Sequence, residues 1–80
     1  MRWYVKQIKN DEDHISIAYS YEKNDSCDGR LTYDKATTSI SIENLSEGAD
    51  DFATRWLFSH IHGLIRRNEL TDKKKMIAIG

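Results

Sequence analysis

The chain has 80 residues, a formal net charge of −1, and a composition that is 39% hydrophobic and 31% charged. This length fits one small domain over residues 1–80 and leaves no room for a second, substrate-binding domain. An aromatic content of 10% argues against a disordered tail, and no apolar run approaches the roughly 20 residues of a membrane-spanning helix. The single cysteine cannot form a disulfide within the chain, so we expect a reducing compartment and a cytoplasmic protein.

Four strands are predicted in the first half of the chain, at residues 3–9, 14–21, 30–33 and 38–43. Apart from a polar loop over 22–29, the connections between them are short, so we expect neighbouring strands to pair antiparallel. The side chains predicted to face inward are Ile15, Ile17, Tyr19, Tyr21, Leu31, Tyr33, Ile40 and Ile42. The first strand has apolar residues on both of its faces, and which one turns inward stays open.

One long helix is predicted after these strands. It has about 20 residues and ends near Asn68, a residue type that tolerates the left-handed conformation with which helices close. Asn44, Ser46 and Asp50 are alternative N-caps. A final strand at 74–79 is expected at a sheet edge, beside the first strand or against another chain.

The predicted order of elements is β-β-β-β-α-β. We therefore expect an α+β fold in which one long C-terminal helix packs on one face of an antiparallel sheet of four to five strands.

The predicted helix carries more apolar surface than one sheet requires. Its apolar arc spans about 240° at about 100° per residue, whereas a helix lying on a sheet needs a stripe of about 100°. A loop, a second copy of the chain or another partner must cover the surplus. One flank of this arc is the candidate interface, which consists of Phe52, Trp56, His60, Gly63 and Arg67. Core packing explains the same flank equally well. A glycine inside a helix lowers its stability by about 1 kcal/mol relative to alanine. We therefore expect that another element approaches Gly63 closely, where a side chain would not fit.

Charges are unevenly distributed, because the middle of the chain is acidic and both ends are basic. The basic cluster consists of Arg66, Arg67, Lys73, Lys74 and Lys75. One interpretation is nucleic-acid binding through this cluster, with Trp3 or Tyr4 stacking on bases. The other is a solvated lysine turn after the end of a helix, and a sequence pI of about 6.3 favours it. If the two ends lie side by side, one region of the surface is positive.

Residues 24–35 place oxygen-bearing side chains at the first, third and fifth positions and Gly29 at the sixth. Over this first half the segment resembles the calcium loop of EF-hand proteins, and the resemblance implies a calcium site. Lys35 stands at the last position, where the EF-hand loop has a glutamate, and the flanking segments have the pattern of strands. A solvated turn is therefore the favoured interpretation.

No motif for catalysis or for a cofactor stands out. A zinc site would have to gather its soft ligands from separate elements, the available ones being His14, Cys27, His60 and His62. Cys27 lies in an acidic loop, which disfavours its thiolate, and the glycines are too dispersed for a phosphate-binding loop. We therefore expect no enzyme activity, no cofactor and no metal.

The small size and the surplus apolar surface lead to a functional hypothesis. We expect a non-catalytic protein-interaction module that self-associates as a homodimer, through the candidate interface or a sheet edge. The alternative is a nucleic-acid-binding accessory domain that uses the basic cluster. Neither hypothesis involves a membrane or a small-molecule substrate.

Overall fold

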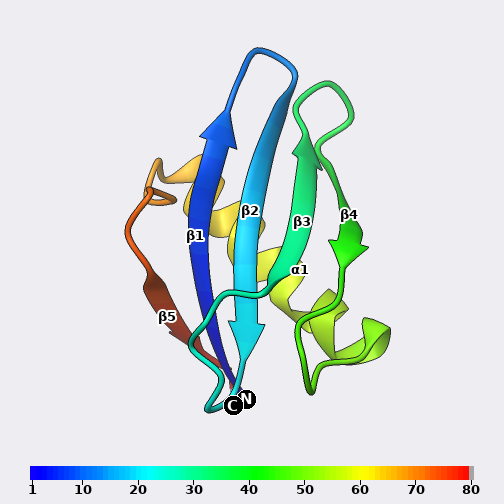
Figure 1. Ribbon diagram of the computed structural model, residues 1–80. Coiled ribbons are helices and arrows are strands. Elements are labelled where there is room, and N and C mark those ends of the chain that lie inside the picture. The colour runs from blue at the N-terminus through cyan, green and yellow to red at the C-terminus, as the bar shows by residue number, and fades with distance from the viewer. Residues whose placement is uncertain (80) are drawn as a thin grey trace.

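The computed structural model describes residues 1–79, in which five antiparallel strands form one sheet and a helix lies across one of its faces (Figure 1). The elements in chain order are β1 (Arg2–Asn10), β2 (His14–Tyr21), β3 (Gly29–Asp34), β4 (Ser39–Asn44), α1 (Asp51–Arg66) and β5 (Lys75–Ala78). The strands lie in the order β4-β3-β2-β1-β5 across the sheet. The predicted α+β fold is confirmed, and the last strand pairs at the sheet edge beside β1.

A β-bulge in β1 explains why the inward face of this strand is ambiguous in the sequence. Trp3 and Val5 are fully buried on the face that α1 covers. The register of β1 against β2 shifts between Gln7 and Lys9, so Ile8 is the extra residue, and its side chain is half exposed. A one-residue shift moves the following side chains to the other face, which breaks the simple alternation.

The core lies between the sheet and one stripe of α1. Leu57, Ile61 and Leu64 have the spacing of one helix face and are buried against the sheet. Each such side chain contributes about 1.5–3 kcal/mol when it is fully buried, so this stripe holds α1 in place. Every side chain predicted to face inward belongs to this core or packs against it.

Two capping interactions set the length of α1. Asp50, one of the alternative N-caps, accepts a hydrogen bond at Oδ1 from the Ala53 amide over 2.7 Å. At the other end Asn68 has a φ of 57°, and its amide donates to the Ile65 carbonyl, as the sequence suggested for the helix end. The helix has 16 residues, so the predicted length of about 20 residues was too long.

The loop between β2 and β3 crosses the face of the sheet opposite α1 (Figure 1). Ser20 of β2 faces this loop and is fully buried, with its Oγ 4.0 Å from the Cys27 Sγ. Cys27 is also buried and has a φ of 53°. The thiol therefore fills the contact between the loop and the sheet.

Candidate protein interface

The most exposed aromatic side chains of the described chain lie on the outer face of α1, which we define as Phe52, Arg55, Trp56 and Ser59. Phe52 is 72% exposed and Trp56 is 55% exposed. Their ring centroids are 6.2 Å apart at an interplanar angle of 78°, an edge-to-face geometry that aromatic pairs favour. The interpretation of these two residues as core is therefore wrong.

The four residues of the outer face line an open hollow of about 270 Å³. The Arg55 side chain is held at its rim, because its Nε lies 2.6 Å from the Asp51 Oδ1 and its guanidinium 5.8 Å from the Phe58 ring centroid. The hollow is shallow and smaller than pockets that enclose drug-sized ligands, which span about 300–1,000 Å³.

Sequence reasoning missed two of the four residues that form this hollow. Arg55 and Ser59 are polar, so they lie outside the apolar arc from which the candidate interface was chosen. They adjoin Phe52 and Trp56 because residues three and four apart are neighbours on a helix surface. That spacing is the signal that would have included them.

The remaining members of the candidate interface differ in their exposure. His60 and Arg67 are exposed, whereas Gly63 is buried. A Cβ atom added at Gly63 would lie 3.0 Å from a terminal nitrogen of Arg67, which covers the glycine. The expectation that another element approaches Gly63 is therefore wrong, since the close neighbour belongs to the end of the same helix.

The basic cluster is divided between two acidic partners. Arg67 Nε lies 2.6 Å from the Glu69 Oε1, and Lys75 Nζ lies 3.7 Å from the other oxygen of the same carboxylate. The hydrogen bond from Arg67 is the main reason why the pKa of Glu69 lies below its usual value. The charges of Arg67 and Lys75 lower it further. Lys74 instead lies 3.6 Å from the Asp25 carboxylate. Within the basic cluster, only Arg66 and Lys73 have no ion pair among residues 1–79.

The two basic ends of the chain do lie side by side, since β1 and β5 pair antiparallel. Lys74 Nζ lies 5.5 Å from the centroid of the Tyr4 ring, which combines a positive charge with an aromatic surface at this edge. Lys74 also donates to the Asp25 carbonyl over 3.0 Å, and the nearby Asp25 carboxylate of the β2–β3 loop offsets part of its charge.

A partly buried polar network joins α1 to β2 and to the β2–β3 loop. The Tyr19 hydroxyl lies 3.2 Å from the Thr54 Oγ1 and accepts a hydrogen bond from the Ser46 amide over 3.1 Å. Ser46 Oγ donates to the Asp28 Oδ1 over 2.6 Å, and this bond is the main reason why the pKa of Asp28 lies below its usual value. Ser46 therefore anchors the segment before α1 to the β2–β3 loop instead of capping the helix.

The soft metal ligands do not gather within residues 1–79, where no group of three or more candidate side chains is suited to a metal ion. Cys27 is buried beneath its own loop, and His14 lies 3.8 Å from the Asp34 carboxylate. His62 packs edge-on against the Tyr33 ring, and His60 is exposed on α1. The proposed zinc ligands thus lie in separate places.

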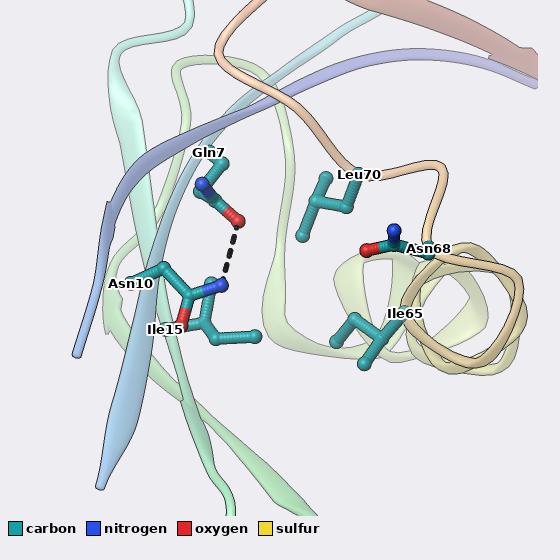
Figure 2. Close-up of a pocket in the computed structure, with 6 residues that line it drawn as sticks. All are labelled: Gln7, Asn10, Ile15, Ile65, Asn68 and Leu70. Atoms are coloured by element: carbon teal, nitrogen blue, oxygen red, sulfur yellow. Dashed lines mark hydrogen bonds between the residues drawn. The ribbon is translucent and has the colours of Figure 1, made fainter. Parts of the chain in front are cut away.

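A second hollow, of about 60 Å³, lies between β1, β2 and the end of α1 (Figure 2). Figure 2 shows the Gln7 and Asn10 side chains turned toward each other, with the Asn10 amide donating to Gln7 Oε1 over 3.2 Å. Ile15, Ile65 and Leu70 supply apolar walls. This hollow is far below the volume of a small-molecule pocket, which leaves the outer face of α1 as the stronger candidate.

Comparisons of the chain with protein-family models, curated proteins and solved structures gave no match. Within residues 1–79, no helix combines the length and the apolar character that crossing a membrane requires.

Proposed function

We propose that this protein is a non-catalytic protein-interaction module that self-associates through the outer face of α1. The observation that carries the proposal is the solvent exposure of Phe52 and Trp56 side by side on one helix. Tryptophan is among the residues that contribute most to protein interfaces, and exposed apolar patches commonly mark such sites.

The rigidity of the site supports a binding role. Both aromatic rings project from a helix whose opposite face is fixed by Leu57 and Ile61 in the core. The backbone from which they project is therefore set before a partner arrives, which lowers the entropy cost of association. An open hollow between large side chains also suits a convex protein surface better than a small ligand.

A second copy of the chain is the partner that best fits the size of this protein. An 80-residue chain without a disulfide has a small core, and such chains often gain stability by oligomerisation. Pairing two outer faces would remove from water the apolar surface that the sheet of one copy leaves uncovered.

Size-exclusion chromatography with light scattering, over a dilution series, tests this proposal. We expect a mass twice that of one chain at high concentration and dissociation on dilution. Trp56→Ala should shift the dissociation to higher concentration. Met76→Ala is the matched control, because Met76 of β5 is 56% exposed and, paired with Tyr4, lies on the sheet face away from α1. A monomer at every concentration contradicts the proposal, and so does equal weakening by the two variants.

Nucleic-acid binding is a second candidate function, favoured by the pairing of the two basic ends and by the Tyr4–Lys74 contact. Single-stranded nucleic acids bind where aromatic rings and positive charges alternate. A titration of the protein into a labelled oligonucleotide at two salt concentrations tests it. Binding that weakens with salt supports this function, and an absence of binding at low salt rejects it.

A further inference from the structure

The exposed surface of α1 differs between its two halves. The N-terminal half presents the large rings of Phe52 and Trp56, while the C-terminal half presents Ser59, His60 and Arg66. The ends also differ in charge, since Asp50 and Asp51 stand at the start of the helix and Arg66 and Arg67 at its end. A surface with this asymmetry is complementary to a reversed copy of itself.

We infer that two copies of the chain pack α1 against α1 in an antiparallel arrangement, with the two helices crossing near Ser59. This inference rests on the proposed function, because it specifies the geometry of that self-association. The occupant of the outer face is thus a second copy whose helix runs in the opposite direction.

The spacing of residues along this surface fits a helix pair. Phe52, Trp56, Ser59, Gly63 and Arg66 are separated alternately by four and three residues, which is the spacing of a seam between two helices. Phe52 and Arg66 lie at equal distances along the chain on either side of Ser59. In an antiparallel pair centred on Ser59, Phe52 of one copy therefore lies opposite Arg66 of the other.

Charge decides between the two possible directions. A parallel pair would place the two copies of Arg66 and Arg67 together, and the two copies of Asp51 together, at opposite ends of the interface. An antiparallel pair places the acidic start of each helix beside the basic end of the other, and it also brings opposite ends of the helix dipoles together. Arg66 is available for such a contact, since it has no ion pair within residues 1–79.

The C-terminal half also offers a surface that suits an aromatic ring. The Arg67 guanidinium covers Gly63, where the helix has no side chain of its own. In the antiparallel arrangement Trp56 of the second copy would lie opposite residue 62, within one residue of Gly63. Arginine over a tryptophan ring is a favourable cation–π contact, so each copy supplies one ring and one guanidinium to the other.

Disulfide cross-linking distinguishes the two directions. Cys27 is first replaced by serine, so that an introduced cysteine is the only thiol. A disulfide needs Cα atoms within about 7 Å, and Ser59→Cys meets this condition at the crossing point. Arg66→Cys meets it only in a parallel pair, because in an antiparallel pair the two copies lie about 21 Å apart along the helix axis.

We expect Ser59→Cys to form a cross-linked dimer on a non-reducing gel and Arg66→Cys to stay monomeric there. Cross-linking of both variants would show a parallel pair and overturn the inference, while self-association would stand. A dimer by light scattering in which neither variant cross-links would place the interface elsewhere and also overturn it. A monomer by light scattering would reject the proposed function itself. Repeating both measurements with Cys27 retained, which is buried, shows whether the replacement by serine disturbs folding.

Discussion

Both faces of α1 carry apolar side chains, yet only those of one face are covered. On the inner face, Leu57 and Ile61 are fully buried against the sheet, whereas Phe52 and Trp56 on the outer face are mostly exposed. One sheet covers only a stripe of a helix, whatever the composition of the remaining surface. We propose that the apolar residues outside that stripe form a surface for another molecule, and we expect the two faces to respond differently to substitution.

The largest expected difference is between Leu57→Ala and Trp56→Ala. Leu57→Ala leaves a cavity in the core and should lower the free energy of unfolding by about 2–5 kcal/mol. Trp56→Ala should change it by less than about 0.5 kcal/mol under dilute conditions, because the ring has few partners within the chain. Urea unfolding followed by circular dichroism measures both. Similar losses for the two variants would mean that the two faces do not differ.

Gly29→Ala tests the polar network that fixes the inner face of α1. A Cβ atom at Gly29 would overlap the Tyr19 ring, whose hydroxyl contacts Thr54 of α1. We expect a loss of about 1–3 kcal/mol in unfolding free energy, typical of overpacking. The control is Ala36→Gly in the exposed β3–β4 turn. Gly48→Ala does not serve, because Gly48 has a φ of 86°, a backbone conformation that other residues rarely adopt. A Gly29→Ala protein as stable as the wild type would contradict this packing.

Asp50→Ala should destabilise α1 as a whole without favouring either face. It removes the hydrogen bond from the Ala53 amide, and losing such an N-cap costs about 1 kcal/mol. Asn44→Ala is the control, since Asn44 was an alternative cap and contacts Asp28 instead. Thermal melts of the two variants measure the difference. A larger loss for Asn44→Ala would contradict the assignment of the N-cap.

The smallest expected effect is a dependence of stability on acid pH. The pKa of Asp28 is lower in the folded chain than its ordinary value, chiefly through the hydrogen bond from Ser46. A carboxyl group of this kind contributes stability above its unfolded pKa, near 3.8, and the contribution is lost as the pH falls through the folded pKa. Asp28→Asn should flatten the loss of stability below about pH 4. A profile unchanged by this substitution would contradict the role given to Asp28.

Most of the fold could be predicted from local pattern, because strand alternation and helix caps are properties of neighbouring residues. The alternation of β2 predicts both its bounds and its inward side chains. The inward face of β1 could not be predicted, since a bulge at Ile8 changes the face midway. Ser46 was one of three alternative N-caps. Its actual role could not be predicted, because its hydrogen bonds to Tyr19 and Asp28 join residues far apart in the sequence.

The candidate interface was predictable only in part. The wide apolar arc indicated that Phe52 and Trp56 needed either a core or a partner, and only the position of α1 on the sheet shows that they lie outside the core. Arg67 was identified as an interface residue, yet its ion pair with Glu69 and its position over Gly63 depend on how the helix ends. The geometry of side chains at a helix terminus is not encoded in hydrophobic periodicity.

Iodide quenching of tryptophan fluorescence tests the central claim most directly, because the chain has two tryptophans in opposite environments. Trp3 is fully buried in the core and Trp56 is 55% exposed on the outer face. We predict that iodide quenches the Trp56 fraction of the emission in dilute protein, and that this fraction becomes protected as the concentration rises through the dimer transition. A quenchable fraction that is the same at all concentrations would contradict self-association through the outer face of α1.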